Sequence, residues 1–372
     1  MSRPAGAWLL DRYIRLAPIM VPIYAVLVAV VIGGLVILGS GADPITAYAA
    51  LLRGAFGGVE AITGSLARSI PFIIASLAVA FGLKAGLFNI GAEGQLIVGA
   101  LAAAWVGAWG VTAGLPGVLA VGLVLLAGIV GGLLYGAIPG VLKAWTGAHE
   151  VITTIMLNAI AVGLIDWLVS SRDPVILLDT SASVPRTALI APGARLPQLL
   201  GGAGLHAGLL IALALCALVW LTLSRTTFGF EIRTVGANPQ AARYAGMSVA
   251  RTVVAVMAAS GAMAGIAGAG EVAGTTGFLV PGAFASVGLD SIGIALLARA
   301  NPIAVIPAAI LWGGLLAGAP LMQLEAGLSL DVVRVVQALI ILCVAADVIV
   351  RRLFGLRSGR GGEQAFAQGW AS

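Results

Sequence analysis

Charged residues are scarce in this sequence. Lysine, arginine, aspartate and glutamate together make up 9% of its 372 residues, whereas soluble domains carry about 25%. Hydrophobic residues account for 60%. This balance excludes an ordinary soluble domain. It predicts an all-α, polytopic membrane protein, because helices satisfy their own backbone hydrogen bonds in lipid.

Residues that build catalytic and metal sites are also few. The chain has two cysteines and two histidines. Cys216 and Cys343 lie inside apolar runs, which indicates neither a disulfide framework nor a metal site. His149-Glu150 begins like a zinc-protease helix, but Thr153 stands where the second histidine is required. We therefore expect no metal site and no enzymatic activity in this chain.

The near absence of lysine bears on nucleotide binding. The only lysines, Lys84 and Lys143, are each followed by alanine, so the phosphate-binding pattern G-x-x-x-x-G-K-[ST] does not occur. The chain cannot bind ATP by that mechanism, and we expect it to carry no cofactor. Its formal net charge of +5 is better explained by unequal loops on the two sides of a membrane than by affinity for nucleic acid.

Long apolar runs are what the sequence contains instead. A membrane-spanning helix needs about 20 such residues. The first run is longer than a signal-peptide core of roughly 7–15 residues, so we interpret it as a retained helix. The runs predict about ten transmembrane helices, near 16–39, 66–84, 90–110, 115–142, 150–170, 205–223, 252–274, 286–299, 303–322 and 332–350.

Basic residues favour one orientation of these helices. With the N-terminus in the cytoplasm, 14 of the 20 lysines and arginines fall on the cytoplasmic side, as the positive-inside rule requires. We therefore expect a multi-pass protein of a bacterial-type inner membrane with both termini cytoplasmic. Residues 1–350 form the predicted transmembrane domain, with an irregular outer loop at 171–204 and an inner loop at 224–251. Residues 351–372 form a basic tail that we expect to be disordered.

Small residues recur at every fourth position in two of the predicted helices. This spacing lets helix backbones approach closely in a membrane. It predicts tight helix packing at Gly128, Gly132 and Gly136, and at Gly261, Gly265 and Ala269.

The stretch Gly86–Gln95 is polar although apolar runs flank it. It holds Asn89, Glu93 and three glycines, which weaken a continuous helix. Irregular polar backbone is tolerated at membrane depth only where it is buried in protein or lines a cavity. We predict that Asn89 and Glu93 help to line a solute path. In the alternative, Asn89 caps the next helix and Glu93 sits in its first turn.

A second polar interruption lies at Gly277–Gly282, flanked by Thr275, Thr276 and Asp290. Paired interruptions in two halves are typical of inverted-repeat transporters, so we expect an inverted-repeat-like arrangement. Two roles are open for the aromatic rings near the two interruptions: stacking on a solute, or packing within the protein. An asparagine midway along a helix offers either solute contact or an interhelical hydrogen bond. The remaining solute-path candidates are Phe88, Gln95, Asn158 and Phe278.

The inner loop contains residues that are typical of the two ends of a short helix. Asn238 suits the N-cap, Pro239 the first helical position and Gly246 the C-terminal stop. The pattern predicts a helix over 240–245 that projects into the cytoplasm. We interpret it as a docking element for a cytoplasmic partner, the alternative being a solvated loop. The candidate coupling residues are Asn238, Pro239, Ala241, Ala242, Arg243, Tyr244 and Gly246.

Three passages, Gly86–Gln95, His149–Asn158 and Gly236–Gly246, together resemble permease subunits of ABC importers for nucleosides, in the same broad family as ribose-type sugar permeases. The resemblance implies a coupling helix within 238–246, cytoplasmic ATPase subunits that use ATP and Mg, a second related permease and an extracytoplasmic solute-binding protein. It favours purine nucleosides as the solute, with ribose-type sugars as the alternative. The rival mechanism is an ion-coupled secondary transporter that uses Glu93 or Asp290.

Overall fold

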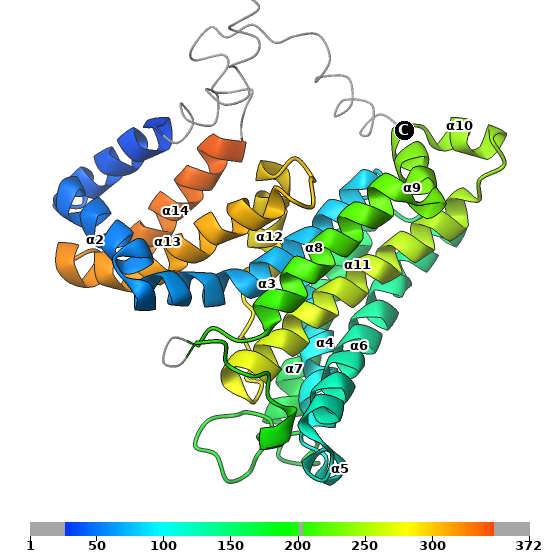
Figure 1. The fold of residues 1–372 in the computed structure, drawn as a ribbon, viewed down its shortest axis with the longest axis horizontal. Coiled ribbons are helices and arrows are strands. Elements are labelled where there is room, and N and C mark those ends of the chain that lie inside the picture. Colours follow the sequence, from blue (N-terminus) through cyan, green and yellow to red (C-terminus); the bar gives the residue numbers. More distant parts are fainter. Residues whose placement is uncertain (1–26, 201–203, 346–372) are drawn as a thin grey trace, which may run out of the picture. The chain divides into compact units, whose positions relative to one another are not determined.

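The computed structural model of this chain describes residues 27–200 and 204–345 (Figure 1). Every regular element in those ranges is a helix, and one long irregular segment between 171 and 207 carries isolated β-bridges and a 3-10 turn at Pro192–Ala194. The start of the first predicted helix, the end of the last and the predicted basic tail lie outside the described residues. The chain divides into a larger unit, Ala55–Ala317, and a smaller unit built from the segments before and after it.

Each predicted apolar run corresponds to a helix. Among the described residues, six helices are long and apolar enough to cross a membrane, or seven if one bent pair counts as a span. This confirms an all-α, multi-pass membrane protein, while the count of ten spans stays a prediction. The helices are Leu27–Gly39, α3 (Val59–Lys84), α4 (Ala92–Gly107), α6 (Gly117–Thr146), α7 (Glu150–Ser170), α8 (Gly208–Arg225), α11 (Val249–Glu271), α12 (Val287–Leu297), α13 (Val305–Ala326) and α14 (Leu330–Ala345).

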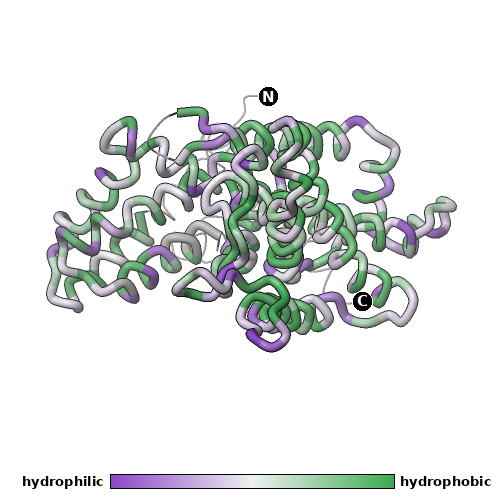
Figure 2. Tube along the Cα trace, turned by 90° about the horizontal axis from the view of Figure 1, so that it is seen from below, coloured by the Kyte–Doolittle hydropathy of each residue, from purple (hydrophilic) through white to green (hydrophobic). Residues whose placement is uncertain are grey.

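Helices α3 and α11 form the centre of the larger unit. They are buried along most of their length, whereas α6, α7 and α8 leave most of their apolar side chains at least partly exposed. These helices run side by side with α4 among them (Figure 1). Hydrophobic residues dominate the trace and hydrophilic ones are scattered (Figure 2). Exposed apolar faces of this extent mark contact with a membrane or a partner, because soluble monomers rarely leave them uncovered.

Helices α6 and α11 touch through the two stripes of small residues. A Cβ atom at Gly132 would lie 2.7 Å from the Cα of Gly265, and one at Gly136 would lie 2.8 Å from the Cα of Gly261. Backbone occupies this space, so no larger side chain fits there. The close packing predicted from the spacing is confirmed, and the structure adds that the two stripes face each other.

The smaller unit holds a helix that the sequence did not predict, α2 (Pro44–Phe56). The Asp43 carboxylate accepts hydrogen bonds from the N–H groups of Ile45 (3.2 Å) and Thr46 (2.9 Å), as a side chain does at a helix N-terminus. Here the chain bends by 119° from Leu27–Gly39. With 13 residues, α2 falls short of the length of a spanning helix, which is why the apolar runs did not reveal it.

The bundle of the larger unit has two distinct ends (Figure 1). One end, the α10 end, carries the short helices α9 (Thr227–Ala237) and α10 (Pro239–Tyr244) that follow α8. The opposite end, the α5 end, carries α5 (Gly110–Ala113) and the irregular segment 171–207. The two polar interruptions lie between these ends.

Candidate functional site

The first interruption, Gly86–Gly91, turns the chain back into the bundle. After α3 ends at Lys84, Gly86 adopts a φ of +72°, which favours glycine because it lacks a Cβ. Asn89 then lies fully enclosed between α3 and α11. Consequently α4 starts at Ala92 inside the bundle, and it is a 16-residue helix instead of the full span predicted near 90–110.

The side chain of Asn89 holds this turn. Its Nδ2 donates to Gln95 Oε1 (3.0 Å) and to Ser260 Oγ (2.8 Å), and its Oδ1 accepts from Gly91 N–H (3.0 Å). Ser260 Oγ in turn donates to the carbonyl of Ala78 on α3 (2.8 Å). Asn89 therefore fixes the turn ahead of α4, two residues before the N-cap position Gly91, instead of capping the helix itself. Two solute-path candidates, Asn89 and Gln95, use their amides inside the protein.

Asn158 ties α7 to the same turn. Its Oδ1 accepts from the N–H of Gly94 (2.9 Å), and its Nδ2 donates to the carbonyl of Ile90 (2.9 Å). Of the two roles predicted for Asn158, the structure contains the hydrogen bond between helices. A solute contact by Asn158 stays a prediction.

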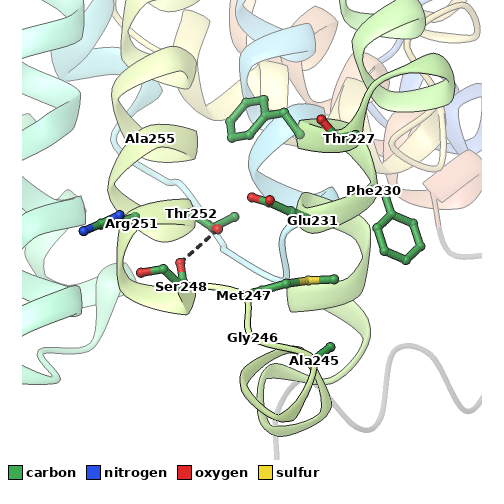
Figure 3. Close-up of a pocket in the computed structure, with 11 residues that line it drawn as sticks. Thr227, Phe230, Glu231, Ala245, Gly246, Met247, Ser248, Arg251, Thr252 and Ala255 are labelled. Carbon is green, nitrogen blue, oxygen red and sulfur yellow. Dashed lines mark hydrogen bonds between the residues drawn. The ribbon is translucent and has the colours of Figure 1, made fainter.

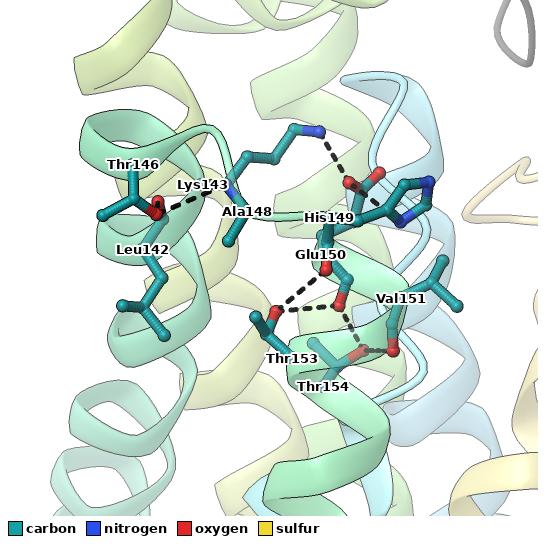
Figure 4. A network of polar contacts seen from close by, with 9 residues as sticks. All are labelled: Leu142, Lys143, Thr146, Ala148, His149, Glu150, Val151, Thr153 and Thr154. Atoms are coloured by element: carbon teal, nitrogen blue, oxygen red, sulfur yellow. Dashed lines mark hydrogen bonds and ion pairs between the residues drawn. The ribbon is translucent and has the colours of Figure 1, made fainter.

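A buried ion pair joins α6 to α7 at the α10 end (Figure 4). Lys143 Nζ lies 2.6 Å from a carboxylate oxygen of Glu150, which is 7% exposed. That carboxylate also faces the backbone N–H of Phe88, so it links the α6–α7 turn to the first interruption. The sequence carried a signal for this pair, because opposite charges stand at the ends of two consecutive predicted helices.

Before the second interruption, α11 widens into a π-helical segment, Val272–Thr276, and the interruption begins at Gly277, whose φ is +77°. The next helix, α12, starts at Val287. Residues 187–198, here called the strap, pair with the π-helical segment and Gly277 from the α5 end. The N–H of Leu196 donates to the carbonyl of Ala273 (2.8 Å), and that of Ile190 to the carbonyl of Gly277 (2.9 Å). The strap thus supplies donors to carbonyl groups that a regular helix would pair internally.

The polar and aromatic candidates at this interruption already have protein partners. Thr276 Oγ1 donates to the carbonyl of Phe278 (2.6 Å). The guanidinium carbon of Arg186 lies 4.9 Å from the centre of the Phe278 ring, a cation–π contact. Thr275 is exposed, and its Oγ1 lies 3.4 Å from His206 Nε2. Stacking of Phe278 on a solute therefore requires the displacement of Arg186 or the use of the other ring face.

His206 was not predicted to matter, and it anchors the start of α8 to this interruption. It is fully buried, and its Nδ1 accepts a hydrogen bond from the N–H of Gly208 (3.1 Å). The proton of a neutral ring is therefore assigned to Nε2, which faces Thr275. A Cβ at Gly274 would lie 2.5 Å from the ring carbon Cγ, so the ring fits only against glycine. Burial lowers the pKa of His206, because it disfavours the charged form of the ring.

The helices that follow the two interruptions, α4 and α12, meet at their first turns. Glu93 lies in the first turn of α4, the position that the alternative to the solute path assigned to it. A solute contact by Glu93 stays a prediction. A Cβ at Gly288 would lie 2.5 Å from Glu93 Cα, so the backbones touch. The Glu93 carboxylate faces the N–H groups of Ser286 and Leu289, where a helix N-terminus favours negative charge. Its Oε2 has no hydrogen-bond partner among the described residues.

A cavity of about 80 Å³ adjoins this contact, lined by Glu93 and by residues 282–285 among others. Asp290 lies one turn into α12, and its carboxylate accepts a hydrogen bond from Ser286 Oγ (3.2 Å). Of the predicted path residues, Glu93 and Asp290 are thus the two acids brought to the junction of the interruptions. Asn89, Gln95 and Asn158 support it from inside the bundle.

Helix α10 has the predicted residues at its two ends. Asn238 Oδ1 accepts from the N–H groups of Gln240 (2.9 Å) and Ala241 (3.0 Å), Pro239 is the first helical residue, and Gly246 has φ +81°. Tyr244 is 94% exposed at its tip. Of the other coupling candidates, Ala242 is buried beneath the helix, while Ala241 and Arg243 are exposed.

The end of α9 also touches the first interruption. A Cβ at Gly236 would lie 2.8 Å from the carbonyl carbon of Ala85 and 2.9 Å from the nitrogen of Gly86. The exposed α10 helix is therefore connected, through direct backbone contact, to the chain that leads to Glu93.

Comparisons with known proteins show the family of this chain. Residues 61–345 match the family model described as the permease component of branched-chain amino acid transport systems. The chain is similar to the guanosine ABC transporter permease protein of Bacillus subtilis, with 39% identity over 93% of this chain and 99% of that relative. It is 34% identical to the nucleoside ABC transporter permease protein of Lactococcus lactis, over 89% of this chain and 92% of the relative. It is also 34% identical to the glucose ABC transporter permease protein of Haloferax volcanii, over 92% of each chain. No solved structure matches the chain.

Proposed function

This chain belongs to the family of permease components of branched-chain amino acid transport systems, and on that premise we propose that it forms the solute path of an ATP-driven importer for nucleosides. Similar permeases named for guanosine and for nucleosides support a nucleoside, with purine nucleosides favoured. A similar permease named for glucose supports sugars as the second candidate. The chain itself carries out no catalysis in this proposal.

The meeting of the helices that follow the two interruptions, at Glu93 and Gly288, is the observation that carries the proposal. Irregular, polar backbone is stable within a membrane protein only in contact with protein or beside a polar cavity. Here the helices that follow the two segments, α4 and α12, touch at Glu93 and Gly288, and residues 282–285 of the second segment line a cavity together with Glu93. We place the solute path along this junction, with the two interruptions as the paired elements of an inverted repeat in a fold of about ten spans.

Partners supply the energy and the selectivity. ATPase subunits on the cytoplasmic side bind ATP and Mg and dock on α10, and a solute-binding protein docks on 171–204 at the outer face. The α10 end is cytoplasmic in this arrangement, together with both termini, because it carries Arg225, Arg233, Arg243 and Arg251. A second, related permease completes the path in the inner membrane.

Alternating access follows from the contacts described above. Closure of the ATPases displaces α10, and the Gly236–Gly86 backbone contact passes the displacement to the first interruption. Since Glu93 lies against α12, the two interruptions then separate or close on each other. A solute needs no tight site at this junction, because the binding protein selects it.

Uptake of labelled guanosine into liposomes tests the proposal, with the chain reconstituted alone or together with its ATPase, second permease and binding protein. We expect ATP-dependent uptake by the complex only. Gly288→Ala is expected to lower the uptake rate at least about tenfold, because overpacking a close contact costs roughly 1–3 kcal/mol. The control Gly163→Ala lies on α7 with no atom within 4 Å of the added Cβ.

Glu93→Gln separates the two transport mechanisms. In the proposed importer it weakens the contact with α12 and lowers ATP-driven uptake. Uptake by the chain alone, driven by an ion gradient and abolished by Glu93→Gln, would establish the ion-coupled rival. Unchanged uptake by a folded Glu93→Gln variant would remove Glu93 from the path.

A further inference from the structure

A cavity of about 540 Å³ lies between α9 and the first turns of α11, beside α10 (Figure 3). Apolar surface from Phe228 and Met247 forms part of its wall, and Ser248 and Thr252 belong to its polar lining. The chain just after α10, from Ala245 onward, also lines it. A protein that touches the tip of α10 therefore passes over this cavity.

The charged group inside the cavity is Glu231. Its side chain points from α9 into the space, whereas Arg251 on α11 points away from it (Figure 3). Glu231 is half-buried and has no hydrogen bond or ion pair among the described residues. In the same unit, the buried carboxylate of Glu150 is paired with the half-buried Lys143.

The surface around the cavity has the opposite charge. Glu231 is the only acidic residue between 224 and 251, a segment that contains four arginines. The four arginines repel a basic side chain of a partner from this segment, and Glu231 is the one charged group in it that attracts such a side chain. The partner surface that complements this charge distribution is therefore acidic, with one basic side chain opposite Glu231.

We propose that the cavity receives an arginine or lysine side chain from the cytoplasmic ATPase subunit, whose remaining contact surface is acidic. This inference rests on the proposed function and adds the chemistry of the partner's contact. The aliphatic stem of the side chain lies against Phe228 and Met247. Its charged head pairs with Glu231, in two parallel hydrogen bonds if the residue is arginine.

Co-purification of the full complex from native membranes at rising salt tests the pairing. We expect Glu231→Lys to weaken retention of the ATPase at least about tenfold, which corresponds to about 1.4 kcal/mol, and Glu231→Gln to weaken it less. The control Ala237→Lys adds positive charge on an exposed residue at the end of α9. It is expected to retain the ATPase as well as the unchanged chain does, or better. A substitution of one basic ATPase residue by glutamate is expected to rescue Glu231→Lys.

Thiol labelling identifies the occupant. Glu231→Cys is introduced after Cys216→Ala and Cys343→Ala, and the new thiol is exposed to a charged methanethiosulfonate. We expect rapid labelling of the permease alone and protection once the ATPase is bound. Full labelling in the assembled complex would overturn the proposal. A second result would also overturn it: the thiol is protected without the ATPase, and this protection disappears when the chain is shortened to residue 345. The occupant of the cavity would then be the chain's own basic tail.

Retention of the ATPase distinguishes a wrong role for the cavity from a wrong function for the chain. If the ATPase binds and Glu231→Lys retains it like the unchanged chain, only the cavity's role is wrong. If the unchanged chain retains no ATPase at all, the importer itself is rejected, and the cavity's role with it.

Discussion

The two interruptions of the bundle are stabilised in different ways. The first, Gly86–Gly91, is held by its own Asn89 and by side chains from three surrounding helices: Gln95 of α4, Asn158 of α7 and Ser260 of α11. The second, after Val272–Thr276, is held by the strap at the α5 end, largely through backbone hydrogen bonds. One is therefore fixed from within the bundle, and the other from a segment at its surface.

Because of this difference, we expect the second interruption to move more easily than the first. Breaking the first requires buried polar groups on several helices to lose their partners together, which costs far more than a single hydrogen bond. Breaking the second requires only that a surface segment move away. In the proposed importer, the first interruption is the fixed side of the solute path. The second is the side that responds when a binding protein contacts the outer segment.

The largest effect is expected for Asn89→Leu. The substitution leaves the Gln95 Oε1, the Gln95 Nε2 and the N–H of Gly91 without their partner, while Ser260 keeps its bond to the Ala78 carbonyl. Each buried unsatisfied group costs about 1–3 kcal/mol, so we expect a loss of at least about 3 kcal/mol in the free energy of unfolding, measured in mixed detergent–SDS micelles. The control Asn301→Ala removes an exposed side chain that accepts from Ile303 N–H (2.9 Å), and should cost about 1 kcal/mol. Equal losses would show that Asn89 does not fix the first interruption.

A smaller and local effect is expected for Thr187→Val in the strap. Thr187 Oγ1 accepts the N–H of Leu279 at 3.0 Å, and its loss leaves that buried group unpaired at a cost of about 1–3 kcal/mol. Amide hydrogen exchange should accelerate over 272–280 and stay unchanged over 86–95. The control Thr234→Val removes a hydroxyl that donates only to the carbonyl of Phe230 (2.8 Å), within its own helix α9. Acceleration over both interruptions would contradict their independence.

The smallest effect is a pH dependence from His206. Burial lowers its pKa in the folded state, so between that value and the unfolded value of about 6.5 the unfolded chain binds more protons. Stability present above pH 6.5 is therefore lost as the pH falls through this window. His206→Gln should make the fall in melting temperature between pH 7.5 and 5.5 shallower, while the exposed His149→Gln should not. Parallel curves for the unchanged chain and His206→Gln would refute this contribution.

Local features of the fold could be predicted from the sequence because they depend on neighbouring residues. Asn238, Pro239 and Gly246 mark the ends of α10, and the structure has them in those positions. The interruption at Gly86–Gly91 was visible as polar residues between apolar runs. Helix α2 was missed because its 13 residues fall below the length that hydropathy detects.

The partners of the polar residues could not be predicted in this way. Asn89 and Ser260 are 171 positions apart, and no local periodicity relates them. The same holds for His206 and Thr275, whose pairing depends on how the segment 171–207 returns to the end of α11.

The sequence by itself determined the environment of this protein, the position of its apolar helices and the two places where they are interrupted, since hydropathy, glycine and capping residues act over a few positions. Only the tertiary structure decided that the helices after the interruptions meet at Glu93 and Gly288, that α4 starts inside the bundle, and that Glu231 faces an empty space beside α10. These features depend on which backbones pack together. That is settled by the shape of whole helices, above all by the facing glycines of α6 and α11.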